Sequence, residues 1–203
     1  MRERRMYMKY SFTKLLFFCS LTSVLVFSCV STVERIDEDT RVDLSGRWND
    51  TDSRLVAQEM TDDSLARVWL EDFIDANGKK PAVIVGSIRN MSHEHISTEA
   101  FIKDIEREYV NSGRVRVIQA GAARDEIRKE RTDQQQFASP ETVRKWGREL
   151  GADFILQGVL NSIVDADSRE KLVFYQVDLE LTDIETNEKV WIGTKKIKKI
   201  IKK

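Results

Sequence analysis

Two places in the sequence hold residue types with distinctive chemistry. The first is Cys29, in the stretch VFSCVST, and the chain has only one other cysteine, Cys19. A thiol can carry a lipid, form a disulfide or bind a metal. The second is the run His93, Glu94, His95, which offers two imidazoles and a carboxylate, all of them zinc ligands.

The residues before Cys29 have the parts of a secretory signal. Five basic residues and one acidic residue precede it, and the stretch Leu15–Phe27 carries no charge. This apolar run of 13 residues is too short for a membrane-spanning helix, which needs about 20. We therefore predict a signal peptide over residues 1–28, with the start of translation left open between Met1 and Met8.

The residues around Cys29 resemble a bacterial lipobox. Val26 is the aliphatic residue three positions before the cysteine and Ser28 is the small residue just before it, whereas Phe27 is bulkier than usual. Cys19 is a poorer candidate because an aromatic residue precedes it. The resemblance implies that Cys29 becomes the first residue and carries an acyl lipid such as palmitate. The alternative is an ordinary cut near Ser28, which leaves a free thiol without a disulfide partner.

No other motif points to a cofactor or to catalysis. The two histidines lie in a predicted strand-to-helix loop without a third histidine or cysteine, so we expect a polar loop and no metal. The acidic stretch Asn49–Asp52 lacks the glycine and glutamate of a calcium loop and is typical of a helix cap. The sequence has no G-x-S-x-G, P-loop or G-x-G-x-x-G motif. We therefore expect neither an enzyme nor a bound cofactor.

After the signal peptide, we expect a lipidated tether over residues 29–52 and one α/β domain over residues 53–203. Alternating and 3.6-residue periodicities predict the elements of this domain. The predicted helices cover residues 54–75, 98–110, 122–131 and 139–150; the predicted strands cover 82–88, 114–119, 153–164, 171–182 and 189–200.

The order of these elements predicts a mixed β-sheet with flanking helices. The second helix lies between two short strands, which is a βαβ unit with parallel strands. The nearly uninterrupted apolar run 82–88 predicts a central strand covered on both faces. The last three strands are joined by short turns and form an antiparallel meander. In the strand 171–182, one face holds alternating apolar residues, which are Val173, Tyr175, Val177, Leu179 and Leu181.

Charge excludes a nucleic-acid partner and leaves two charged surfaces to explain. The net charge is −1, and the chain from Cys29 on has 28 basic and 33 acidic residues. Six lysines lie between Lys195 and Lys203. They either attract anionic lipid or cell-wall polymer, or protect an edge strand from unwanted pairing, which we favour. The stretch Ala123–Gln136 is rich in charge, and we read it as a solvated face rather than a binding surface.

Four segments carry a family resemblance: KPAVIVGSIRNMSHEHI, NSGRVRVI, ELGADFILQGVL and FYQVDLELTDIETNEKVWIG. They resemble the LpoB family of outer-membrane lipoproteins that activate penicillin-binding proteins, over roughly residues 42–200. The N-terminal domain of TolB and the CsgG secretion lipoprotein share the general form. The resemblance implies a small mixed sheet flanked by helices, as the element order also predicts.

The resemblance also implies the function. We expect a monomeric lipoprotein that is anchored in the outer membrane by lipid at Cys29 and faces the periplasm. The outer membrane is favoured because neither Val30 nor Ser31 is the aspartate that retains lipoproteins in the inner membrane of some bacteria. We expect this lipoprotein to bind and activate a bifunctional peptidoglycan synthase, a class A penicillin-binding protein, and thereby to regulate cell-wall synthesis. The resemblance places no contact residue on this sequence. The alternative is an envelope assembly or secretion lipoprotein of the CsgG type, which forms rings.

The predicted tether is shorter than the long Pro-rich tether of the best-known family members. From Val30 to Asp52 it has about 23 residues, or at most about 80 Å when fully extended. Its length limits the partners that the domain can reach from the membrane.

Overall fold

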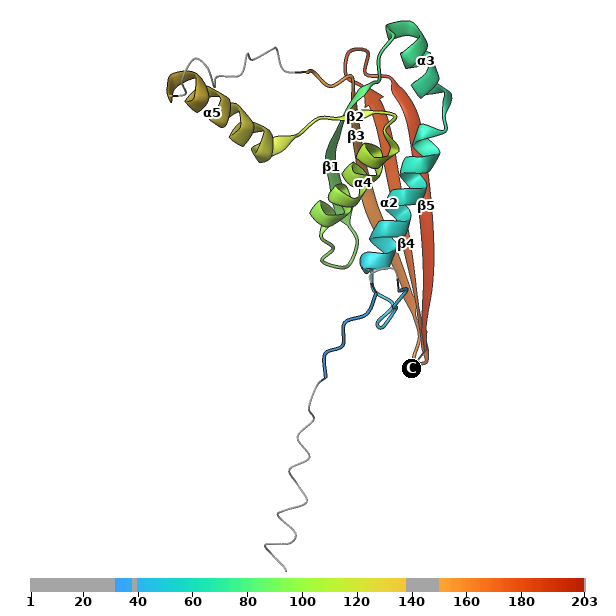
Figure 1. Cartoon of the computed structure of the whole chain (residues 1–203). Helices are drawn as coiled ribbons and strands as arrows, with labels where there is room; N and C mark the ends of the chain where they lie inside the picture. The colour runs from blue at the N-terminus through green and yellow to red at the C-terminus, as the bar shows by residue number, and fades with distance from the viewer. Residues whose placement is uncertain (1–31, 38–39, 138–149, 203) are drawn as a thin grey trace, which may run out of the picture. The chain divides into compact units, whose positions relative to one another are not determined.

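The computed structural model describes residues 32–37, 40–137 and 150–202 (Figure 1). The chain divides into two compact units, Met1–Thr40 and Arg41–Lys203. The described residues of the first unit form no helix or strand. Those of the second unit form helices α2 (Asp50–Leu65), α3 (Val68–Asn77), α4 (Thr98–Ser112) and α5 (Gly121–Phe137), and strands β1 (Ala82–Met91), β2 (Arg116–Val117), β3 (Phe154–Ala166), β4 (Glu170–Asp183) and β5 (Lys189–Lys202).

The five strands form one mixed sheet in the order β2-β1-β3-β4-β5. Strand β1 pairs in parallel with both β2 and β3. Strands β3, β4 and β5 pair antiparallel along almost their whole lengths. The predicted α/β fold, a βαβ unit followed by an antiparallel meander, is therefore confirmed.

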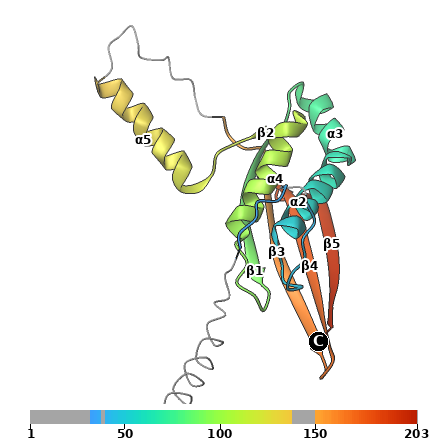
Figure 2. The ribbon, with the colours of Figure 1, turned by 60° about the horizontal axis from the view of Figure 1, so that its bottom comes forward.

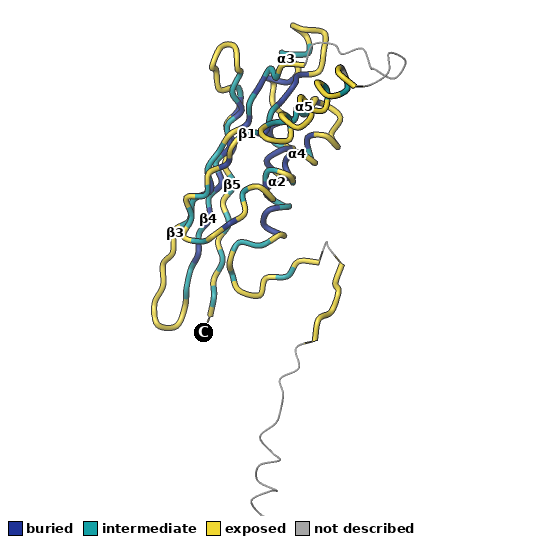
Figure 3. Tube along the Cα trace, turned by 90° about the vertical axis from the view of Figure 1, so that its left-hand side faces the viewer, coloured by how far each residue is buried: buried dark blue, intermediate teal, exposed yellow. Residues whose placement is uncertain are grey.

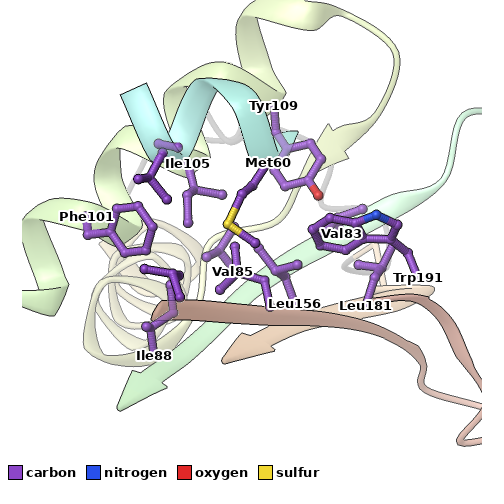
Figure 4. Close-up of a cluster of buried hydrophobic side chains, with 14 of the residues drawn as sticks. Met60, Val83, Val85, Ile88, Phe101, Ile105, Tyr109, Leu156, Leu181 and Trp191 are labelled. Atoms are coloured by element: carbon purple, nitrogen blue, oxygen red, sulfur yellow. The ribbon is translucent and has the colours of Figure 1, made fainter. Parts of the chain in front are cut away.

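The core lies between this sheet and helices α2 and α4, which both cover the same face (Figures 2 and 3). The alternating residues of β4 that were predicted to share a face, from Val173 to Leu181, are each at most 1% exposed. On α4, the predicted stripe Phe101, Ile105 and Tyr109 is equally buried. Figure 4 shows Met60 of α2 pointing into the same apolar cluster. Burial of these side chains is the main stabilising contribution to the fold.

The helix predicted over residues 54–75 is two helices, α2 and α3, which meet at Ala66 and Arg67. The break coincides with two backbone carbonyls that accept hydrogen bonds from side chains. The indole of Trp69 donates to the carbonyl of Ser64 at 2.7 Å, and the guanidinium of Arg114 donates to that of Leu65 at 2.6 Å. A continuous helix would give both carbonyls to amides one turn later.

The prediction that strand β1 is covered on both faces is wrong for the described part of the chain. Val83, Val85 and Ile88 are buried under the helices, whereas Ser87 and Arg89 on the same strand are exposed. The apolar run was misleading because helices α2 and α4 lie on one face only. The described helices leave the other face open.

Three other predicted elements differ in length or lie elsewhere. Strand β2 has only two residues, because it pairs with the first two residues of β1 alone. Helix α5 continues to Phe137 and so includes the polar run after residue 131. The helix predicted over 139–150 falls almost entirely outside the described residues.

Gly158 allows β3 and β4 to pair closely on the core face. A Cβ atom at this position would lie 2.4 Å from the carbonyl oxygen of Asp178 and 2.4 Å from a methyl group of Leu179. The backbone oxygen belongs to the paired strand and cannot move without disrupting the ladder.

We therefore predict that Gly158→Ala lowers the free energy of unfolding by about 1–3 kcal/mol, the usual cost of overpacking a core. Gly151→Ala is the matched control, since a Cβ there meets nothing within 4 Å. Urea denaturation followed by tryptophan fluorescence measures both. Equal midpoints for the two variants would show that the close approach at Gly158 does not constrain the sheet.

Candidate functional site

The folded unit begins at Arg41, earlier than the boundary expected at residue 53. Residues 41–49, which we call the strap, connect the N-terminal unit to helix α2. At the end of the strap Asn49 caps the helix: its side chain accepts from the amide of Asp52 at 3.1 Å, and the Asp52 carboxylate accepts from the amide of Asn49 at 3.0 Å. The helix-cap interpretation of Asn49–Asp52 is thus confirmed, and these residues belong to the domain rather than to a free tether.

Lys199 of β5 holds the strap from one side. Its ammonium lies 2.6 Å from the Asp52 carboxylate and 3.0 Å from that of Asp43, and it donates to the carbonyl of Arg47 at 3.0 Å. The side chains of Lys199 and Asp52 are only 9% and 11% exposed. A nearly buried ion pair of this kind leaves an uncompensated charge when either partner is removed.

Gly46 lets the strap approach the end of β5. Its φ is +66°, a backbone conformation that favours glycine. A Cβ atom there would lie 2.5 Å from the side chain of Ile201. The strap therefore passes directly over this part of the strand.

Glu94, in the loop after β1, holds the strap from the other side. One carboxylate oxygen accepts from the amide of Trp48 at 3.1 Å, and the other accepts from the hydroxyl of Tyr175 at 2.9 Å. The indole of Trp48 packs edge-on against the rings of Tyr175 and Phe101, with centroids 5.6 and 6.1 Å away, and donates to the hydroxyl of Ser53 at 2.7 Å. Strap, loop, helix and sheet therefore meet at this carboxylate.

His93 links the same loop to strand β3. Its Nδ1 lies 2.6 Å from the Ser162 hydroxyl, and its backbone amide donates to that hydroxyl at 2.9 Å. Its Nε2 lies 3.3 Å from the Glu94 carboxylate. Serine, histidine and glutamate thus form a chain of contacts. The serine oxygen accepts a hydrogen bond from the backbone amide of His93, so the contacts of Ser162 tie the loop after β1 to strand β3.

A pocket of about 590 Å³ lies beside the strap. The strap and helix α2 contribute Arg47, Trp48, Asn49, Asp50 and Ser53. The loop after β1 contributes residues 93–97, helix α4 contributes Ala100, and β4 contributes Lys171. Both histidines of the predicted cluster thus line one cavity. Among the described residues, however, no group of three or more His, Cys, Asp and Glu side chains is arranged to hold a metal ion.

The two titratable groups beside the strap whose pKa values are shifted, Tyr175 and Lys199, keep at neutral pH the protonation states that their contacts require. Burial raises the pKa of Tyr175 well above 10, and the neighbouring Glu94 carboxylate raises it further. Burial alone would lower the pKa of Lys199, but its hydrogen bonds to Asp52 and Asp43 outweigh this effect and raise it above 10.5. Both groups therefore keep the protonation state that the site needs, a neutral phenol and a charged ammonium.

The residues singled out from the sequence fall in different places. Cys29 lies outside the described residues, so its lipidation stays a prediction. Among the C-terminal lysines, Lys199 binds the strap and Lys195 pairs with Glu59 of α2. The charged stretch Ala123–Gln136 falls within α5. Glu94 and Lys199 could not be recognised as anchors of the strap from local sequence, because their partners lie 46 and 147 residues away.

Comparison with solved structures gives similar proteins at low identity. The LpoB C-terminal domain from Salmonella enterica is 15% identical, with a TM-score of 0.33, and the match covers 63% of this chain and 91% of that one. The LpoB C-terminal domain from Escherichia coli is 16% identical (TM-score 0.37; 72% and 98% covered). The lipoprotein GNA1162 from Neisseria meningitidis is 12% identical (TM-score 0.38; 60% and 83% covered). A comparison with curated proteins gave no match.

A family model described as the peptidoglycan-synthase activator LpoB matches residues 52–197. The chain belongs to the LpoB family. The family resemblance seen in the sequence is therefore confirmed, and the fold is the LpoB-like mixed sheet. Membership implies the role of a peptidoglycan-synthase activator, which acts as a regulator in the cell envelope. The match begins at the helix that the strap joins to the N-terminal unit.

The ion pairs of Lys199 predict that the strap detaches when this lysine is replaced. We expect Lys199→Met to release residues 41–49 from the domain, because it leaves the nearly buried Asp52 carboxylate without its cation, a loss of about 3–5 kcal/mol at most. Trypsin should then cut after Arg41 and Arg47 at least about tenfold faster. Lys195→Met is the control, since Lys195 pairs with a glutamate side chain that is 60% exposed and such pairs contribute little. The same cleavage rate in both variants would contradict the anchor.

The two buried tyrosines predict how the domain responds to alkaline pH. Tyr109 and Tyr175 are the only tyrosines after residue 28. Burial raises the pKa of Tyr109 to about 12 and that of Tyr175 well above 10. Because the folded state favours the neutral phenols, their contribution to stability is complete below pH 10 and is lost as the pH rises further.

Absorbance at 295 nm of the chain from Val30 on should therefore show almost no tyrosinate at pH 10.5. Tyr109 should ionise only near pH 12 and Tyr175 only well above pH 10, or both should ionise together with unfolding, which circular dichroism detects. Ionisation of one tyrosine with a midpoint near pH 10 in the folded protein would contradict this picture of the site.

Proposed function

We propose that the mature chain begins at Cys29, carries lipid on the cysteine sulfur, and is anchored in the outer membrane on its periplasmic side. From there it binds and activates a class A penicillin-binding protein. The observation that carries this proposal is the LpoB family match over residues 52–197. The lipobox around Cys29 and the charge-free run Leu15–Phe27 support the anchor. In the part of the chain that the structure describes, no helix has the length and apolar character to cross a membrane.

We infer that activation works by shifting the synthase between an inactive and an active conformation. A regulator without chemistry of its own accelerates an enzyme by binding the active conformation more tightly than the inactive one, which shifts the population. The domain needs only a rigid binding surface for this purpose, and a well-packed sheet with two covering helices provides one. The proposed protein acts as a monomer, and the family match does not favour the ring-forming secretion type.

The strap shortens the free tether. Since the folded unit begins at Arg41, only residues 29–40 separate the proposed lipid from the domain. These twelve residues span at most about 42 Å when fully extended, about half of the 80 Å expected for a tether up to Asp52. We infer that the domain works close to the membrane that holds it, and that the synthase ectodomain reaches out to it.

Lipidation and activation are tested together with Cys29→Ser. In cells given radioactive palmitate, the wild-type chain should be labelled and found in the membrane fraction, and the variant should be unlabelled and released from it. The purified domain of either chain should accelerate glycan polymerisation from lipid II by a class A penicillin-binding protein of the same organism, since the sulfur takes no part in binding the synthase. Labelling of the variant would contradict the lipid site, and an unchanged polymerisation rate with every such synthase would contradict activation.

A further inference from the structure

The described helices leave uncovered the sheet face opposite α2 and α4, which we call the open face (Figure 3). Side chains alternate between the two faces of a strand. The open face therefore holds the even-numbered residues of β4 and β5 over 172–180 and 192–200, the odd-numbered residues of β3 over 157–163, and Arg89 and Met91 of β1.

One end of the open face is apolar and exposed. Met91, Ile163 and Ile200 are 62%, 65% and 63% exposed. They are joined by two partly buried residues, because Ile163 pairs with Phe174 across β3 and β4, and Leu172 pairs with Ile200 across β4 and β5. None of these five side chains contributes to the core on the other face. Contiguous exposed apolar residues of this kind typically mark an interaction site.

The charges that remain free on this face are mostly positive. Arg89, Lys196 and Lys198 have no ion-pair partner among the residues that the structure describes; the ammonium of Lys198 lies 5.9 Å from the centre of the Phe174 ring. Two carboxylates on the face have partners within it, although only Glu180 is paired with a cation. Asp178 accepts from Gln176 at 2.9 Å and from Thr194 at 2.7 Å, and Glu180 pairs with Lys189 at 2.7 Å. Asp165, at the hairpin end, is the exception.

The open face is not flat, because it contains a pocket beside Arg89. Its volume is about 290 Å³, and its walls include Ser87, Gln157, Val159 and Asp178. Arginine and aromatic residues beside exposed aliphatic ones, with hydrogen-bonding groups around them, make up the usual composition of a protein–protein interface.

We propose that the open face docks the peptidoglycan synthase, through a surface of the synthase that presents apolar side chains next to carboxylates. The inference rests on the proposed function, which makes a synthase the partner. The free positive charge calls for carboxylates on the partner, and the apolar end calls for aliphatic or aromatic side chains. Electrostatic complementarity of this kind sets both the association rate and the orientation of the partner.

Two other occupants fit the same face less well. An anionic membrane would be drawn to the same cations, but it presents no protruding group of fixed shape to fill the pocket beside Arg89. A second copy of the chain, packed face to face, would oppose Arg89, Lys196 and Lys198 to the same cations, and such like-charge contacts oppose association.

Two variant pairs test the proposal independently. Ile163→Glu with Ile200→Glu places carboxylates in the apolar end, and Lys196→Glu with Lys198→Glu reverses the free charge. Matched controls are Val110→Glu, at a residue of α4 that is 58% exposed, and Lys129→Glu, at an exposed residue of α5. Thermal unfolding monitors the fold. If the apolar pair unfolds the domain, the lysine pair still tests the face, since both lysines are exposed.

Binding to a detergent-solubilised class A penicillin-binding protein from the same organism is measured by surface plasmon resonance, and stimulation by lipid II polymerisation. We expect each open-face pair to weaken Kd on the order of tenfold or more and to reduce stimulation in parallel, with the controls unchanged. Wild-type affinity in both open-face pairs would overturn the docking surface while leaving the function intact. No binding by the wild-type chain itself would instead overturn the proposed function, and the docking surface with it.

The alternative occupants are measured with the same variants. Flotation with vesicles of phosphatidylethanolamine and phosphatidylglycerol tests a membrane, and light scattering tests self-association. Loss of vesicle binding or of a dimer in the open-face variants, with synthase binding intact, would overturn the proposal in favour of that occupant. Absence of both in the unlipidated chain from Val30 on, together with weakened synthase binding in the variants, supports it.

Discussion

The carboxylate of Glu94 is the contact on which the N-terminal end of the domain depends. It receives the amide proton of Trp48 from the strap and the hydroxyl proton of Tyr175 from the middle of the sheet. A carboxylate that is only 13% exposed needs such donors, because burying it without them costs several kcal/mol. The same contacts that satisfy Glu94 therefore also fix the strap.

The second constraint is that the described helices α2 and α4 cover only one face of the sheet. Their apolar stripes pack on alternate residues of β4, and the intervening residues of that strand remain on the other side. On the covered face, Lys199 joins β5 to Asp43 and Arg47 of the strap. On the open face, Lys196 and Lys198 are left for a partner. Strand β5 thus holds the strap on one face and, in our proposal, contributes to docking on the other.

Much of the fold could be predicted from the sequence, because local periodicity reports which side of an element is buried. Helix α4 and strand β4 have strong patterns of this kind, and both lie where they were expected. The break between α2 and α3 could not be predicted, because it depends on hydrogen bonds from Trp69 and from the distant Arg114. The apolar run of β1 suggested two covered faces, since an unbroken run does not tell how many helices lie over it.

The candidate site was less predictable than the fold. The histidine cluster drew attention to the loop that contacts the strap, but the anchoring side chain there is Glu94, which is one of 34 acidic residues in the sequence. Likewise, Lys199 is one lysine among several at the C-terminus, and only the paired strands bring it to Asp52. Contacts across more than 40 residues leave no local pattern, so the extent of the strap emerges from the structure alone.

Hydrogen–deuterium exchange of the chain from Val30 on tests the central claim, that the strap is part of the folded domain. The amides of Trp48 and Asn49 donate to carboxylates of the domain, so they should exchange at least about a hundredfold more slowly than in an unstructured peptide, as amides of a packed element do. Glu94→Ala should remove the protection of Trp48 while α4 stays protected. Exchange of both strap amides at the unstructured rate, with α2 protected, would contradict the account.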